Sequence, residues 1–317
     1  MTDSTLTAAG HQRRQVLCGG VGLLALGALP GLAGAAQSSG APALETLNDS
    51  LSILRAGGCN TLVLRSGDGL LLVDGGSAEK SSAMLSQLRK FASGSAVQLL
   101  FNTHWHAEQS GANEALAKAG AKILAHEHTR LWLSTDHYQP REERYAKARP
   151  KLAWPTQTFR GTGNLTFGSE YLEYGYLPLA HTDGDAYLFC RDSNVVAAGH
   201  VVTSSGDPEL DWFAGGWLGG RLDALDILLA RCDDKTRIVP AQGPVMTRDA
   251  LKAQRALIQE VYDRSVKLVR KGMNSHDMVE AGVLRDLPHT WVDPEGFMYA
   301  VCKGLWAHHD MLSNDIV

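Results

Sequence analysis

From residue 51 onward, short apolar runs alternate with longer amphipathic stretches. An apolar run bounded by glycine or polar residues is typical of a buried strand, and apolar residues spaced three and four apart are typical of a helix. The first pattern predicts strands at residues 62–64, 70–73, 97–101, 122–124, 158–167, 170–177, 185–190, 195–199 and 237–239. The second predicts helices at residues 77–91, 219–231 and 247–271, and two shorter helices on either side of residues 122–124.

Some of these elements carry signals at their ends. Gly67-Asp68-Gly69 separates two apolar runs and predicts the turn of a β-hairpin. Ser77 is a suitable N-cap for the helix that follows it. The helix over residues 247–271 ends at Gly272, and its apolar residues at helical spacing are typical of core packing rather than of a ligand site.

The predicted elements form two β-rich halves with helices between them. This order indicates one α/β domain, with a sheet-on-sheet core flanked by helices, which we assign to residues 51–317. Residues 135–157 interrupt the pattern with three prolines and a cluster of charges, and they predict a surface insert. Residues 272–317 predict a C-terminal helical extension.

The first 36 residues have the pattern of an export signal. Arg13 and Arg14 precede an apolar, glycine-rich run over residues 16–32, and small residues follow at 33–36. This order predicts a cleaved signal peptide that uses the twin-arginine export machinery, and hence a periplasmic or secreted protein. An uncleaved membrane anchor is the alternative, but the run is barely long enough to span a bilayer. Residues 37–50 are predicted to be a linker.

Composition narrows the class of protein. The formal net charge is −4, so no basic face is expected and nucleic acid is not predicted as a partner. No later run approaches the ~18 apolar residues of a transmembrane helix, so the mature chain is not expected to insert stably into a membrane. Five cysteines are too few for a disulfide scaffold, and we expect buried thiols. The sequence gives no indication of the oligomeric state.

The candidate chemistry lies in the segment His104-Trp105-His106-Ala107-Glu108. With 12 histidines in the chain, chance alone gives about half of one His-x-His pair, so the pair needs support from its context. His104 and His106 follow an apolar strand, and residues two apart in extended backbone face the same side, so both imidazoles can meet one metal ion. A second pair, His126 and His128, is predicted to be a solvated helix start.

In its order of motifs, the chain resembles the metallo-β-lactamase superfamily. The hallmark of that family is His-x-His-x-Asp-His after a strand, followed by a distant His, a later Asp and a final His. The corresponding segments here are Leu71–Gly75, Asn102–Asn113, Ala180–Asp185, Gly199-His200 and Pro240–Pro244. The resemblance covers about residues 51–250 and implies an αββα sandwich, in which two mixed β-sheets lie face to face between helices.

The resemblance also implies metal ligands. His104, His106 and His181 keep the three histidines of the family's first metal position, whereas every ligand of the second position is altered, to Glu108, Gln109, His200 and Gln242. Glutamine is a weak zinc ligand, and the bridging carboxylate is lost, so one zinc ion is favoured over two. Iron or manganese is also possible.

His200 and Glu108 have several possible roles. His200 could complete a closed four-histidine site, hold a second ion with Glu108, Gln109 and Gln242, or shuttle protons. Glu108 could be the general base, or it could orient a ligand histidine.

A three-histidine zinc site with an open position generates a hydroxide nucleophile near neutral pH. The resulting hypothesis is an exported hydrolase that attacks a small-molecule ester, lactone, thioester or lactam with a zinc-bound hydroxide. The alternatives are a non-catalytic metal-binding or sensing protein and an iron or manganese redox enzyme. The loop over residues 201–220 predicts a pocket wall, with Trp212 or Trp217 facing the substrate.

Overall fold

The structure is a computed structural model that describes residues 44–312 except 57, 93 and 140–142. The chain divides into two units, Met1–Gly40 and Ala41–Val317, and the fold below is that of the second. The predicted signal peptide lies outside the described residues. Among the described helices, none is both long enough and apolar enough to cross a membrane.

One sheet of seven strands is built mainly from the first half of the domain. Its order is β1-β2-β3-β4-β5-β6-β9; β1 to β4 pair antiparallel, and β4, β5, β6 and β9 pair parallel. The strands are β1 (Leu44–Thr46), β2 (Leu51–Ala56), β3 (Cys59–Ser66), β4 (Gly69–Val73), β5 (Val97–Asn102), β6 (Lys122–His126) and β9 (Gln157–Phe159). The strand β1 lies inside the predicted linker 37–50, so that prediction is wrong for its last part: Leu44–Thr46 pair with the edge of β2.

A second sheet of five strands comes from the later half. The strands, in order, are β10 (Thr162–Phe167), β11 (Glu170–Tyr176), β12 (Ala186–Cys190), β13 (Val195–Ala197) and β14 (Arg237–Val239). The predicted strand 158–167 is wrong in one respect, because it is split between β9 of the first sheet and β10 of the second. A run of alternating residues does not reveal that the chain crosses from one sheet to the other.

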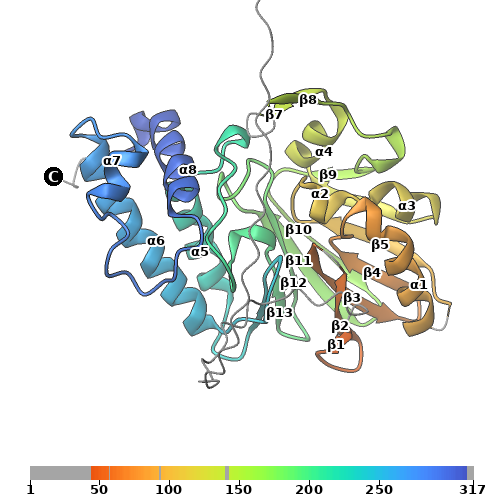
Figure 1. The fold of residues 1–317 in the computed structure, drawn as a ribbon. Coiled ribbons are helices and arrows are strands. Elements are labelled where there is room, and N and C mark those ends of the chain that lie inside the picture. The colour runs from red at the N-terminus through yellow and green to blue at the C-terminus, as the bar shows by residue number, and fades with distance from the viewer. Residues whose placement is uncertain (1–43, 57, 93, 140–142, 313–317) are drawn as a thin grey trace, which may run out of the picture. The chain divides into compact units, whose positions relative to one another are not determined.

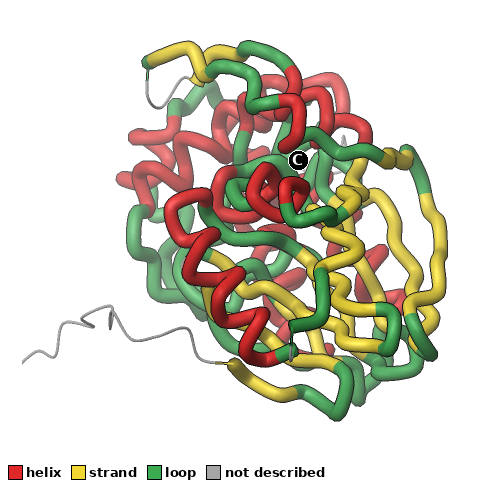
Figure 2. The backbone as a smooth tube through the Cα atoms, turned by 90° about the vertical axis from the view of Figure 1, so that its right-hand side faces the viewer, coloured by secondary structure: helices red, strands yellow, loops and turns green. Residues whose placement is uncertain are grey.

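Helices cover the outer face of each sheet (Figures 1 and 2). On the first sheet these are α1 (Ser81–Phe91), α2 (Ala107–Ser110), α3 (Asn113–Lys118) and α4 (Glu127–Ser134). On the second they are α5 (Leu218–Arg231) and α6 (Arg248–Val269), and α8 (Pro294–Ala307) packs on these two helices and on α7 (Ser275–Glu280). Ser77 does not cap α1 as predicted: it precedes a 3-10 turn (Ala78–Lys80) and makes no side-chain capping bond, and α1 begins four residues later.

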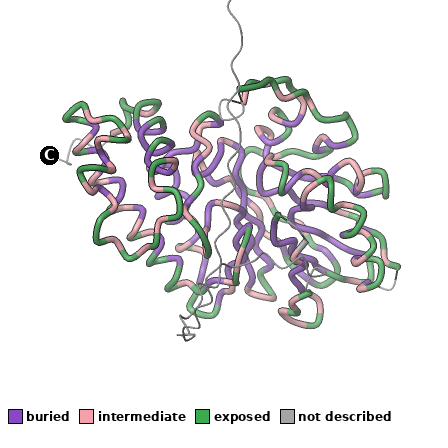
Figure 3. The backbone as a smooth tube through the Cα atoms, in the orientation of Figure 1, coloured by how far each residue is buried: buried purple, intermediate pink, exposed green. Residues whose placement is uncertain are grey.

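Three apolar layers hold the sheets and helices together. Alternate residues of β4 illustrate them: Leu71 and Val73 pack between the two sheets, whereas Leu70 and Leu72 pack against α1 and α3. On β12, Leu188 joins the layer between the sheets, and its neighbour Phe189 joins the layer under α5 and α6. Buried residues accordingly follow the central strands and the inner sides of the helices (Figure 3). The αββα sandwich implied by the resemblance is confirmed.

The predicted insert contains a hairpin of its own, its last residue Gln157 already belongs to β9, and the described cysteines are buried as expected. Residues 135–157 contain a two-stranded hairpin, β7 (His137–Gln139) with β8 (Arg144–Ala146), and a 3-10 turn at Lys151–Ala153. The hairpin pairs with neither main sheet. The four described cysteines, Cys59, Cys190, Cys232 and Cys302, are buried free thiols.

One carboxylate fastens the C-terminal extension to the loop that follows β13. The Asp207 carboxylate accepts hydrogen bonds from the main-chain N–H groups of Val292 and Asp293, at 3.1 and 2.7 Å, and from His289 Nε2 at 3.0 Å. Burial alone would raise the pKa of Asp207, but these donors outweigh it, and the pKa lies below its ordinary value. The extension is thereby tied to the loop 201–220.

We predict that Asp207→Ala lowers the free energy of unfolding at pH 7 by about 1–3 kcal/mol, because three donors lose their acceptor. Since the folded pKa is depressed, the contribution is present above the unfolded pKa of about 3.9 and is lost as pH falls through the folded pKa. Urea denaturation of both proteins, at pH 7 and at lower pH, measures the difference in their free energies of unfolding. The exposed Asp310→Ala is the control, and equal stability of the two variants at pH 7 would contradict the prediction.

Candidate metal centre

The first two histidines of the site are placed by the end of β5. The strand ends at Asn102, and His104 and His106 follow on the loop that leads into α2. Asp74, at the end of β4, accepts hydrogen bonds from the main-chain N–H and the hydroxyl of Thr103, at 2.8 and 2.7 Å. The parallel pairing of β4 with β5 therefore fixes the direction in which the loop leaves the sheet.

The other two histidines come from loops of the second sheet. His181 lies between β11 and β12, where its main-chain N–H donates to the buried Asp185 carboxylate at 2.6 Å. His200 lies in a 3-10 turn after β13. Gly199 before it has φ of +55°, and a Cβ there would come within 2.5 Å of Thr103 Oγ1, so only glycine fits. The sandwich thus brings both loops to the end of β5.

Four imidazoles meet at this point. His104, His106, His181 and His200 each present one ring nitrogen, and these four atoms lie within 4.8 Å of one another. The His106 Nδ1–His181 Nε2 distance is 3.1 Å, and the His104 Nε2–His200 Nδ1 distance is 3.2 Å. Two nitrogens bound tetrahedrally to one zinc at about 2.0–2.1 Å lie about 3.3 Å apart. The donor set and its spacing therefore fit a single zinc ion.

The outward nitrogens of His104 and His106 lead to carboxylates. His104 Nδ1 lies 3.0 Å from Thr103 Oγ1, whose hydroxyl donates to Asp74, so His104 donates to Thr103 and keeps its Nε2 lone pair for the centre. His106 Nε2 lies 2.9 Å from Asp211 Oδ2. Such partners fix the tautomer and orientation of ligand histidines.

The remaining two outward nitrogens face Glu209. His181 Nδ1 donates to the main-chain carbonyl of Glu209 at 2.9 Å, and His200 Nε2 lies 3.9 Å from its carboxylate. All four imidazoles therefore turn one nitrogen inward and find a partner for the other. The loop that carries Glu209 and Asp211 is the predicted pocket wall, but no sequence pattern indicates that these two residues hydrogen-bond or face the histidines.

Burial sets the protonation of the cluster. Burial lowers the pKa of His104 and His181 well below the ordinary value, and it lowers that of His200 to about 4. At His106 burial also acts downward, but the Asp211 carboxylate outweighs it and raises the pKa. A metal needs the unprotonated nitrogen, so the site is arranged to keep most of its imidazoles neutral at pH 7.

A buried arginine holds the loop that carries these partners. Arg221 of α5 is fully buried and donates to the carbonyls of His200 and Glu209, both at 2.7 Å, and to Thr203 Oγ1 at 2.9 Å. Burial lowers its pKa to about 10, so it stays charged. Arg221 is not among the predicted site residues, although this charged residue stands three residues after Leu218 on the apolar face of the helix.

The other predicted ligands lie differently. Glu108 is exposed on α2, where a Cβ added at Gly58 of the β2–β3 turn would meet its side chain, and Gln242 is exposed and donates to the Gly58 carbonyl at 2.8 Å. Gln109 is fully buried, and neither polar atom of its side-chain amide has a partner in the described part of the chain. Within the described part of the chain, no side-chain hydrogen bond joins any of the three to an imidazole of the cluster.

The second histidine pair is structural. His126 and His128 do begin α4, as predicted, but His126 is not solvated: it is 3% exposed and stacks on Tyr176 with ring centroids 4.3 Å apart. Burial lowers its pKa to about 4. The two residues take no part in the four-histidine cluster.

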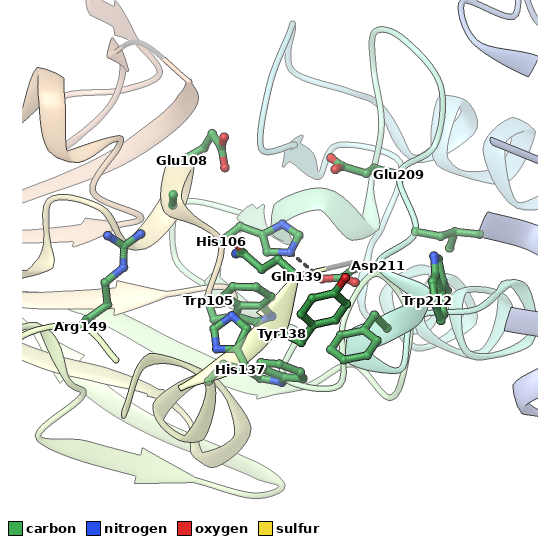
Figure 4. A pocket seen from close by; sticks show the side chains of 14 residues that line it. Trp105, His106, Glu108, His137, Tyr138, Gln139, Arg149, Glu209, Asp211 and Trp212 are labelled. Atoms are coloured by element: carbon green, nitrogen blue, oxygen red, sulfur yellow. Dashed lines mark hydrogen bonds and ion pairs between the residues drawn. The ribbon is translucent and has the colours of Figure 1, made fainter. Parts of the chain in front are cut away.

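A cavity of about 230 Å³ opens beside His106 (Figure 4). Its wall combines acidic and aromatic residues: Glu108, Glu209, Asp211, Trp105, Trp132 and Phe213. Trp212 also lines it, as expected for one of the two loop tryptophans, whereas Trp217 is buried and stacks on His308. Of the four histidines, His106 lines this cavity, so the cavity meets the cluster at that residue.

We predict that Thr103→Val weakens metal binding by about 10- to 100-fold, because His104 Nδ1 loses the acceptor that fixes its tautomer. Competition with a chromogenic chelator measures the affinity. The exposed Thr162→Val should leave it unchanged. An unaltered affinity in Thr103→Val, with the fold intact by circular dichroism, would show that the hydroxyl does not serve the metal.

Comparison with known proteins agrees with this geometry. A family model described as the metallo-beta-lactamase superfamily matches residues 54–235, more than half of the chain. The metallo-beta-lactamase type 2 of Bacillus cereus is 26% identical over 192 residues, which are 61% of this chain and 70% of that protein.

Solved structures share the fold at lower identity. A metallo-beta-lactamase from Pontibacter korlensis is 20% identical with a TM-score of 0.57, covering 69% of this chain and 99% of its own. The DIM-1 metallo-beta-lactamase is 17% identical with a TM-score of 0.55, covering 69% of this chain and 97% of its own. Because the family model spans more than half of the sequence, the chain belongs to the metallo-β-lactamase superfamily.

Proposed function

We propose that the protein is a zinc-dependent hydrolase of a small acyl compound. The observation that carries the proposal is the convergence of four imidazole nitrogens within 4.8 Å of one another, with His106 on the wall of a cavity of about 230 Å³. A zinc ion held there would lower the pKa of a bound water to about 7 and so supply a nucleophile at neutral pH. His104, His106, His181 and His200 would hold it.

The histidines and their partners would prepare this site. The outward hydrogen bonds of His104, His106 and His181 hold their inner nitrogens toward one point, so little reorganisation accompanies metal binding. His200 would occupy the direction that a three-histidine site leaves open. Zinc in catalytic sites also becomes five-coordinate, so His200 does not by itself block access of water.

Glu108 is the proposed general base. It lies on the wall of the cavity that also contains His106, and it is exposed to whatever occupies that cavity (Figure 4). Hydrolysis adds the oxygen of water to the acyl carbon, breaks the bond to the leaving group and moves a proton to that group. A carboxylate beside the cavity can accept the proton from water and return it to the leaving group.

The substrate class follows from the family and from the altered ligands. The Bacillus cereus relative and the solved neighbours are named metallo-beta-lactamases. In this chain Glu108, Gln109, His200 and Gln242 replace the second-metal ligands, which favours one ion over two. We therefore propose an ester, lactone, thioester or lactam as the substrate.

A non-catalytic metal-binding or sensing protein is the second candidate. The His200 Nδ1–His104 Nε2 distance is 3.2 Å, close to the 3.1 Å between His181 Nε2 and His106 Nδ1. The four imidazoles could therefore saturate one ion. A closed set of four ligands is typical of structural zinc. Iron or manganese bound to the same imidazoles would instead favour a redox enzyme.

We predict one zinc ion per chain in the purified protein, and hydrolysis of at least one member of a chromogenic ester, thioester, lactone and lactam panel. The double variant His104→Ala/His106→Ala should lose the ion and at least about a hundredfold in kcat/KM, since two of its ligands are gone. Elemental analysis and initial rates measure both. The exposed His309→Ala serves as the matched control.

Two results would overturn the proposal. Full activity in the metal-free double variant would exclude metal-dependent hydrolysis. A cobalt-substituted protein with a four-coordinate spectrum that no added ligand perturbs, together with no activity on the panel, would instead establish the closed binding site.

We further propose that the protein is exported by the twin-arginine route to the periplasm or beyond. The support is sequence alone: Arg13 and Arg14, the apolar run 16–32 and the small residues at 33–36. That route carries proteins already folded, which suits a buried four-histidine site that is loaded before export.

We predict that the full chain with a C-terminal tag reaches the periplasm of a bacterial host about 36 residues shorter. Arg13→Lys/Arg14→Lys should remain uncut in the cytoplasm, because the arginine pair is the recognised signal. Fractionation and intact mass measure this. The pair Arg89→Lys/Lys90→Arg in the mature chain is the control, and equal export of all three proteins would refute the twin-arginine route.

A further inference from the structure

A second cavity adjoins the one beside the histidines. Its volume is about 210 Å³, and the two cavities share part of their walls: Trp105, Trp132, His137, Gln139 and Arg149. The remaining walls of the second cavity come largely from the insert hairpin and the segment after it. The insert 135–157 therefore shapes the space next to the metal centre.

The shared wall is an aromatic cluster. Trp105 and Trp132 are stacked with ring centroids 5.1 Å apart and an interplanar angle of 15°. The His137 ring stands edge-on to both, at 5.1 and 4.9 Å. Trp105 follows His104 directly, so this cluster begins one residue from the metal centre. Flat rigid rings are suited to hold a planar group by stacking.

The two cavities differ in charge. The cavity beside the histidines has Glu108, Glu209 and Asp211 in its wall. The adjoining cavity has three cationic residues, Arg144, Lys147 and Arg149, and no acidic residue among the described residues that line it. An anionic group is therefore disfavoured at the acidic wall and favoured at the far end.

Arg149 is the cation best placed to bind that group. It lines both cavities, it is exposed, and within the described residues no carboxylate lies at ion-pair distance from its guanidinium. Lys147, by contrast, is already paired with Asp136 at 2.7 Å. A guanidinium can bind a carboxylate through two parallel hydrogen bonds, which gives both strength and orientation.

We propose that the substrate is an acyl compound with a planar aromatic group and a carboxylate. The aromatic group lies against Trp105, Trp132 and His137, the carboxylate binds Arg149, and the acyl bond lies toward the histidines. This inference rests on the proposed function for the position of the acyl bond, whereas the recognition of ring and anion is tested without turnover.

The test compares three ligands on the zinc-loaded full chain by isothermal titration calorimetry. 2-Naphthoate has both ring and carboxylate, 2-naphthalenemethanol has the ring without the charge, and acetate has the charge without the ring. We expect 2-naphthoate to bind about tenfold or more tightly than either. In the Arg149→Gln variant, 2-naphthoate should bind no more tightly than 2-naphthalenemethanol. In the control variant Arg89→Gln, at an exposed position of α1, 2-naphthoate should still bind more tightly.

Each failure has a distinct meaning. Equal binding of naphthoate and acetate would mean that the carboxylate binds the metal and that no ring site exists. Equal binding of naphthoate and the alcohol, or no binding of either, would exclude an anion site. If 2-naphthoate still binds more tightly than the alcohol to the Arg149→Gln variant, the carboxylate binds somewhere other than Arg149. All of these overturn the inference whether or not the protein hydrolyses the panel, and the expected pattern would support it even in an inactive protein.

Discussion

The structure depends on holding four imidazoles within less than 5 Å of one another, with most of the rings neutral and three of them oriented by an outward hydrogen bond. Unpartnered imidazoles at this spacing would rotate away or take up protons and repel. The chain meets the constraint by giving each ring an outward partner: Thr103 with Asp74 for His104, Asp211 for His106, and Glu209 for His181 and His200. Asp211 and Glu209 also place negative charge where a divalent ion would need it.

Meeting this constraint has a cost in stability. Asp74 and Asp185 are buried, and burial raises the pKa of each to about 7. Arg221 is a fully buried cation, and its Nε atom has no hydrogen-bond partner in the described part of the chain. Burying such groups is unfavourable unless they are well paired, and replacing them with apolar residues is often stabilising. Their concentration around one cluster indicates that the site, rather than the core, determines these positions.

The shared fold and the individual features of this chain have separate roles. The sandwich supplies the loop after β5 and the loops of the second sheet, and solved relatives cover about two thirds of the chain. The insert adds Arg144, Lys147 and Arg149 beside the cavity, and the C-terminal extension is fastened through Asp207 to the loop that carries Glu209 and Asp211. The common fold thus brings the four histidines together, and the added segments shape the cavities and loops beside them.

The sequence by itself determined most of the strands and helices, the sandwich, and the candidates His104, His106, His181 and His200, because apolar periodicity and motif order are local properties of a chain. It did not reveal that the predicted strand 158–167 is divided between two sheets, or that His126 is buried against Tyr176. Nor could it pair Asp211 with His106, 105 residues apart. Only the tertiary structure decided these points, since the packing of the two sheets determines which loops meet and which side chains they bring together.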